Sequence, residues 1–166
     1  MYRLSLIILM ATLSVPALAC SFAATTKAFT PSPATFQSKL NTRDRFALLP
    51  PPRVELLSIK RGTAAPGSSC DDAGVITIKV SWPTTSIYPL KNIGFYFRVA
   101  SGQAPDYVFP LTPVTGTRIK NGATEVSFIW LDGSPEQHKM INFVLEVFAV
   151  NRGLEIGPSA TIEIKS

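Results

Sequence analysis

Short runs of alternating hydrophobic and polar residues fill the chain from about residue 50 to its end. The run from Val75 to Trp82 is the most regular, and its larger apolar side chains fall at every second position, at Ile76, Ile78, Val80 and Trp82. A period of two places them on one face of a strand. Gly, Pro, Asn and Asp clusters separate the runs, which is typical of all-β domains.

The runs predict seven strands and no helix of useful length. We expect the strands at Arg53–Lys60, Val75–Trp82, Ile93–Ala100, Thr117–Lys120, Thr124–Leu131, Asn142–Val150 and Ala160–Lys165, with a shorter extended piece at Asp106–Phe109. Asn121-Gly122 accepts positive φ at both positions and predicts a tight hairpin. Strands with one apolar face bury it when two sheets pack about 10 Å apart. The predicted fold is all-β, a two-sheet antiparallel β-sandwich of about seven strands.

The first 19 residues have the features of a secretory signal peptide. Arg3 supplies a positive start, Leu4–Leu13 is mostly apolar, Pro16 interrupts any helix, and Ala17-Leu18-Ala19 has the small-x-small form of a cleavage site. The apolar run is too short to span about 30 Å of hydrocarbon comfortably. We therefore expect an exported bacterial protein, periplasmic or extracellular.

The two cysteines, Cys20 and Cys70, have three alternative fates. They form one disulfide if both stay in the mature chain as thiols. Cys20 becomes the acylated first residue if the leader acts as a lipoprotein signal, and only then do we expect attachment to a membrane. Cleavage after Ala23 or Ala24 removes Cys20 altogether. The last two outcomes leave Cys70 alone.

Residues 20–49 predict a flexible, irregular tether. They are rich in Ala, Thr, Ser and Pro and show no sustained period, although a short helical turn is expected between Ala34 and Asn41. Four phenylalanines are scattered through this stretch, Phe22, Phe29, Phe36 and Phe46. Pro50-Pro51-Pro52 stiffens the chain and marks the start of the sandwich domain, residues 50–166.

Charge is distributed unevenly along the chain. The formal net charge is +5, but residues 50–166 hold 11 Lys and Arg against 10 Asp and Glu. The basic surplus therefore belongs mainly to the leader and the tether. A nearly neutral domain without a Lys/Arg cluster in its sequence argues against nucleic acid as a partner.

Three segments carry a resemblance to a known family. They are Ile78-x-Val80-x-Trp82-Pro83, Phe95-Tyr96-Phe97-Arg98-Val99, and the terminal hairpin from Phe143 to Ser159. Because of these three segments, residues 51–165 resemble the fibronectin type III domain, one of the immunoglobulin-like sandwiches. The resemblance implies that Trp82 lies between the sheets and that the third and sixth strands are neighbours. The family usually has Tyr where Phe143 stands, so packing must hold that corner here.

The strand pattern leaves an apolar outer face on one sheet, formed by Tyr96, Val144, Phe148 and Val150, with Arg98 and Glu146 able to pair across strands. Contiguous exposed apolar area favours a partner surface, most simply for a protein. The structural alternative is that the tether folds back and covers this face with its phenylalanines.

Candidate catalytic residues have simpler structural explanations. His138 is the only histidine and falls in a polar stretch between strands, without a recognisable nucleophile motif. Asp132 and Glu136 resemble the paired carboxylates of glycosidases only in spacing. Asp71-Asp72 suits a turn better than a cation site. Trp82 and Trp130 fall among the positions expected to face the core, so neither indole is expected to stack on a sugar ring.

These observations predict no enzyme activity, cofactor or metal. We expect a non-catalytic binding or structural module of the bacterial envelope or secretome. The alternatives are an envelope lipoprotein acylated at Cys20, an accessory polysaccharide-binding module, and a hydrolase whose site has no familiar motif.

Overall fold

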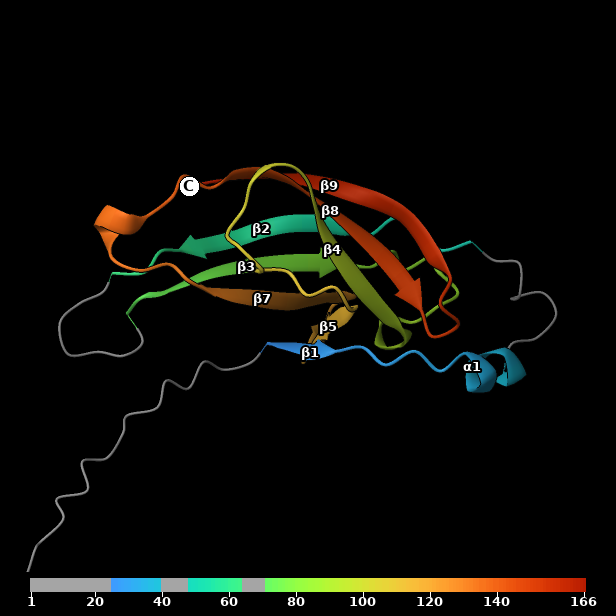
Figure 1. Cartoon of the computed structure of the whole chain (residues 1–166). Coiled ribbons are helices and arrows are strands. Elements are labelled where there is room, and N and C mark those ends of the chain that lie inside the picture. Colours follow the sequence, from blue (N-terminus) through green and yellow to red (C-terminus); the bar gives the residue numbers. More distant parts are fainter. Residues whose placement is uncertain (1–24, 40–47, 64–70) are drawn as a thin grey trace, which may run out of the picture.

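The computed structural model describes residues 25–39, 48–63 and 71–166, which form two antiparallel sheets packed face to face (Figure 1). One sheet has the order β2-β3-β7-β6, with β2 at Arg53–Lys60, β3 at Ala73–Ser81, β7 at Ala123–Leu131 and β6 at Ile119–Lys120. The other has the order β1-β5-β4-β8-β9, with β1 at Thr26–Ala28, β5 at Val114–Gly116, β4 at Ile93–Gln103, β8 at Asn142–Asn151 and β9 at Ile156–Lys165. The predicted all-β sandwich is confirmed.

Helical segments are short. The α-helix α1 covers Pro33–Lys39, and two single 3₁₀ turns, η2 and η3, cover Leu90–Asn92 and Pro135–Gln137. Within the described residues, none of these helices has the length and apolar character needed to cross a membrane.

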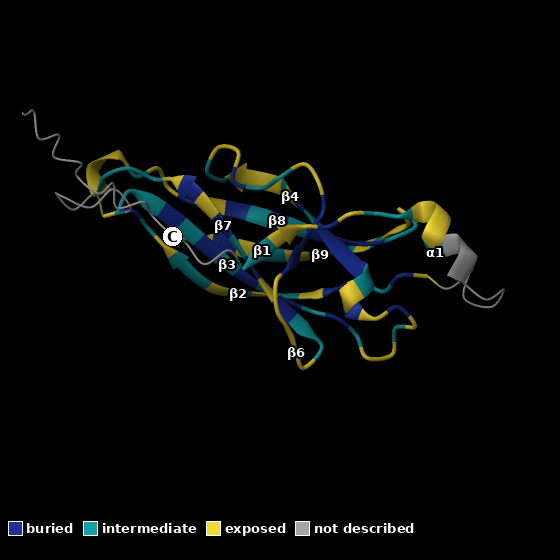
Figure 2. Ribbon diagram, turned by 90° about the horizontal axis from the view of Figure 1, so that it is seen from below, coloured by how far each residue is buried: buried dark blue, intermediate teal, exposed yellow. Residues whose placement is uncertain are grey.

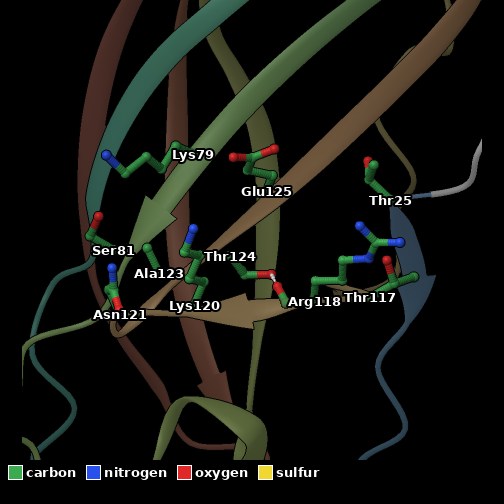
Figure 3. A pocket seen from close by; sticks show the side chains of 10 residues that line it. All are labelled: Thr25, Lys79, Ser81, Thr117, Arg118, Lys120, Asn121, Ala123, Thr124 and Glu125. Carbon is green, nitrogen blue, oxygen red and sulfur yellow. Dashed lines mark hydrogen bonds between the residues drawn. The ribbon is translucent and has the colours of Figure 1, made fainter.

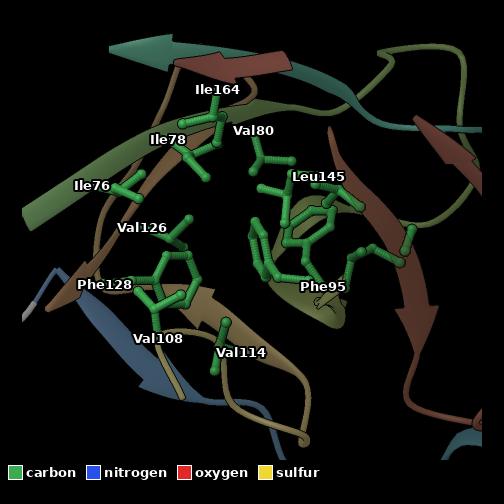
Figure 4. Packing of buried hydrophobic residues seen from close by; sticks show 14 of the residues in the cluster. Ile76, Ile78, Val80, Phe95, Val108, Val114, Val126, Phe128, Leu145 and Ile164 are labelled. Atoms are coloured by element: carbon green, nitrogen blue, oxygen red, sulfur yellow. The ribbon is translucent and has the colours of Figure 1, made fainter. Parts of the chain in front are cut away.

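The core lies between the sheets and follows the predicted alternation. Along β3, burial alternates from one residue to the next, as Figure 2 shows, and Figure 4 shows the buried side chains of both sheets meeting in the middle. Trp82 is 6% exposed, and its ring lies edge-on to Phe95 at 6.2 Å between centroids. Its Nε1 donates a hydrogen bond to the Tyr88 carbonyl oxygen at 2.7 Å, so the indole is buried without an unpaired donor.

The local sequence patterns predicted the positions of most strands correctly. The Asn121-Gly122 turn has φ values of 51° and 70°, as the hairpin prediction requires, and β4 pairs with β8, so the third and sixth predicted strands are indeed neighbours. The extended piece predicted at Asp106–Phe109 is wrong, because Tyr107 has φ 55° and turns the chain. The extended residues lie slightly later, in β5.

The N-terminal segment joins both sheets, which the tether prediction did not anticipate. Strand β1 pairs with β5, placing Thr26 opposite Gly116. Thr26 Oγ1 donates to the carbonyl oxygen of Ser127 at 2.9 Å and accepts the Ser127 N–H at 2.8 Å, and Ser127 belongs to β7 of the other sheet. The prediction of an irregular tether is therefore wrong for Thr26–Ala28, which form a paired strand, while α1 falls where a short helix was expected.

Several predictions concern residues outside the described ranges. These are the signal peptide at residues 1–19, Phe22 and Phe46, and the alternative fates of Cys20 and Cys70. They stay predictions.

Candidate binding surfaces

The outer face of the five-stranded sheet carries an aromatic and charged patch on its two best-paired strands. Tyr96 on β4 and Phe148 on β8 are direct cross-strand partners, and both are half-buried. The next cross-strand pair on this face is Arg98 and Glu146. Val144 is half-buried two positions further along β8. We call Tyr96, Arg98, Glu146 and Phe148 the aromatic patch.

The predicted charge pair across this face is confirmed. Arg98 Nε and Nη2 donate to Glu146 Oε2 at 2.9 and 2.5 Å. The Arg98 guanidinium carbon also lies 4.9 Å from the centroid of the Phe148 ring, which is a cation–π distance. Arg98 is two-thirds exposed, so the pair contributes little to stability. Its effect is to hold the guanidinium in one place above an aromatic ring.

Val150 does not belong to the open part of this face, contrary to the sequence prediction. It is fully buried, and its cross-strand partner is Gly94. A side-chain carbon at Gly94 would lie 2.4 Å from the ring of Phe29, so the absence of a side chain there makes room for that ring. Phe29 is buried, and Arg152 lies over it at 5.8 Å. The tether residue thus covers this end of the face.

The covering segment is held by backbone contacts as well. Phe29 N–H donates to the Pro113 carbonyl oxygen at 2.9 Å, and Ser32 N–H donates to the Arg152 carbonyl oxygen at 2.8 Å. Phe36 packs against Tyr88 with 5.9 Å between ring centroids. The structural alternative considered for the apolar face is therefore realised at one end, and Tyr96, Val144 and Phe148 are left at the other.

The loop between β7 and β8 gathers Asp132 and His138, with Asp132 at its centre. Arg61 donates to both carboxylate oxygens, Nε to Oδ2 at 2.7 Å and Nη2 to Oδ1 at 2.9 Å. The Gly62 N–H donates to Oδ2 at 2.9 Å, and Trp130 Nε1 donates to Oδ1 at 3.0 Å. His138 Nε2 lies 3.3 Å from Oδ2. The Asp132 side chain is 4% exposed.

The electrostatics of Asp132 suit a structural role. Burial raises the pKa of its carboxyl group, but the hydrogen bonds from Arg61, Gly62 and Trp130 outweigh burial and lower the pKa to about 2. A carboxylate whose oxygens already accept four hydrogen bonds is a poor general base, because its lone pairs are occupied and its proton affinity is low.

The other candidate carboxylates do not complete a catalytic set. Glu136 is exposed, and a hydrogen bond with the Ser134 side chain lowers the pKa of its carboxyl group. The carbonyl oxygen of Asp72 accepts the N–H groups of Asp132 and Gly133, at 2.8 and 3.1 Å. The Asp72 backbone therefore connects the turn at Asp71-Asp72 to the end of β7. In the described part of the chain, no three His, Cys, Asp or Glu side chains come together as a metal site would require.

A basic groove of about 700 Å³ lies beside the β6–β7 hairpin, on the outer side of the four-stranded sheet (Figure 3). Three cationic side chains line it, Lys79, Arg118 and Lys120, against one carboxylate, Glu125. Ser81, Thr117 and Asn121 add hydroxyl and amide groups to the lining. Sequence reasoning missed this groove because Lys79 lies about 40 positions before Arg118 and no motif joins them.

No protein-family model, curated protein or solved structure matches this chain. The functional argument therefore depends on the geometry of these surfaces.

Proposed function

We propose that this chain is an exported, non-catalytic binding module with a fibronectin type III-like sandwich. Its aromatic patch binds a protein partner. The observation that carries the proposal is the arrangement of Tyr96, Arg98 and Phe148, which lie next to one another on two adjacent inner strands of a sheet. Export is proposed from the features of residues 1–19.

The chemistry of the patch fits protein recognition. Tyr and Arg are enriched among the residues that contribute most to protein–protein binding, and aromatic residues are enriched at interface cores. Because the Arg98 guanidinium is already fixed by Glu146 and Phe148, little side-chain entropy is lost when a partner covers it. Strands β4 and β8 pair without interruption from Ile93 to Val99, so the patch sits on a rigid support.

The Asp132 cluster supports a non-catalytic function. Its hydrogen bonds connect the end of β7 to Arg61 and Gly62, which follow β2, and to Trp130 in the core. These contacts give a structural reason for Asp132 and His138 to lie together.

Site-specific photo-crosslinking in the producing cell tests the proposal. A benzophenone amino acid replaces Tyr96, and in a control it replaces Ile129, which is exposed on the outer side of the other sheet. We expect a discrete crosslinked protein from position 96 that position 129 does not give. We also expect Phe148→Ala, placed in the chain labelled at position 96, to reduce its yield at least fivefold. Equal crosslinking from both positions, or a yield unaffected by Phe148→Ala, would refute a partner on this patch.

A further inference from the structure

The basic groove differs from the aromatic patch in chemistry and lies on the opposite sheet. We propose that it is a second binding site, and that its ligand is an acidic oligosaccharide whose carboxylate groups lie among Lys79, Arg118 and Lys120. This site does not depend on the protein partner proposed above, because the two surfaces share no residue.

Specific hydrogen bonds fix the backbone that surrounds the groove. Thr124 Oγ1 donates to the Arg118 carbonyl oxygen at 2.7 Å, and the Thr117 N–H donates to the Thr25 carbonyl oxygen at 2.7 Å. Strand β6 is only two residues long, so the sheet stops there and leaves a hollow beside the hairpin instead of a continuous edge. The backbone that carries Arg118 and Lys120 is therefore fixed, while their side chains stay exposed.

The protein neutralises the charges in the groove only in part. Within the described residues, Arg118 and Lys120 have no carboxylate within ion-pair distance, and the Lys79 amino group meets only Glu55, at 3.1 Å between exposed groups. Figure 3 shows Lys79 and Lys120 on the same side of the sheet as Glu125. With Glu55 counted beside Glu125, three cations stand against two carboxylates. The local excess of positive charge lies at Arg118 and Lys120, and it attracts anionic ligands.

The remaining lining points to a saccharide. None of the ten described lining residues is aromatic, so neither the stacking of nucleic-acid bases nor the stacking of neutral sugars has a platform here. Ser81, Thr117 and Asn121 offer side-chain groups that both donate and accept hydrogen bonds, which matches the hydroxyl groups of sugars.

Binding of pentagalacturonate to the mature chain, measured by isothermal titration calorimetry in 50 mM NaCl, tests the assignment. Its methyl ester keeps the sugar backbone and removes the charge. We expect saturable binding of the acid, at least tenfold weaker binding of the ester, and weakening as NaCl is raised. The double variant Arg118→Gln, Lys120→Gln should weaken binding of the acid about tenfold.

The control variant carries the same loss of charge elsewhere. Lys91→Gln with Lys139→Gln removes two exposed cations outside the groove and should change the dissociation constant less than twofold. Equal weakening in the two double variants would show general charge attraction and overturn the site. Failure of the acid to bind, equal binding of the ester, or displacement of the acid by equimolar inorganic phosphate would overturn the oligosaccharide assignment. None of these outcomes bears on the crosslinking at position 96.

Discussion

Replacing Asp132 by Asn changes one atom in a buried carboxylate that accepts four hydrogen bonds. The amide group of the new side chain would turn its own N–H groups toward at least one of the donors from Arg61, Gly62 and Trp130. The structure therefore predicts a large loss of stability from a nearly isosteric change.

The magnitude follows from the pKa. The Asp132 pKa falls from an ordinary value of 3.8 to about 2 on folding, and one pKa unit corresponds to about 1.4 kcal/mol, so the ionised carboxylate contributes about 2 kcal/mol. Because the folded pKa is depressed, this contribution is fully present well above pH 4. It is lost as the pH falls through 3.8 toward 2. With the unpaired donors, we expect Asp132→Asn to cost about 2–4 kcal/mol at pH 7.

Urea unfolding followed by tryptophan fluorescence at pH 7, 4 and 2.5 measures the effect. We expect the difference between the wild type and Asp132→Asn to shrink at pH 2.5. The matched control is Asp106→Asn, an exposed carboxylate 3.7 Å from Lys139, which should leave the free energy of unfolding unchanged. The reasoning is refuted if Asp132→Asn costs less than 0.5 kcal/mol at pH 7, taken as roughly the scatter of surface substitutions. It is equally refuted if the difference stays constant with pH.

Three further predictions concern the N-terminal segment and the β8–β9 turn. Thr26→Val removes the hydroxyl that satisfies both backbone groups of Ser127, so we expect a loss of about 1–3 kcal/mol and faster amide exchange at Ser127; unchanged exchange would contradict this. Gly94→Ala should displace the Phe29 ring and speed proteolytic cleavage near residue 29, as Phe29→Ala should. Gly122→Ala strains its own turn, because Gly122 has a φ of 70°, but meets no atom of Phe29, so it should not speed cleavage there. Asn151→Ala removes the oxygen that accepts the Gly153 and Glu155 N–H groups, and a loss of about 1–3 kcal/mol by urea unfolding is expected; a loss below 0.5 kcal/mol would contradict it.

The sequence predicted those parts of the fold that depend on neighbouring residues. The alternation in Val75–Trp82 and the turn at Asn121-Gly122 are local patterns, and both appear in the structure. Strand β1 is only three residues long, and its position depends on Thr26 meeting Ser127, 101 residues away in sequence. No local pattern encodes such a contact.

In the candidate sites, too, local patterns predicted some features, and contacts between distant segments determined the others. Alternation placed Arg98 and Glu146 on the outer face, and the family resemblance made their strands neighbours; the pair expected from the two together is confirmed. Burial of Val150 was missed because it depends on Phe29 filling the space at Gly94, a contact between distant segments. His138, which the sequence places only in a polar stretch between strands, is partly buried, with its Nε2 3.3 Å from Asp132 Oδ2.

The position of β1 limits how far the sandwich can stand from a bilayer. Were Cys20 acylated, as one of the alternatives requires, only the five residues from Cys20 to Ala24 would separate the lipid from Thr25, whose carbonyl is fixed against Thr117. Five fully extended residues reach about 17 Å. A lipidated form would thus hold the anchored end of this domain no further than that from the headgroups.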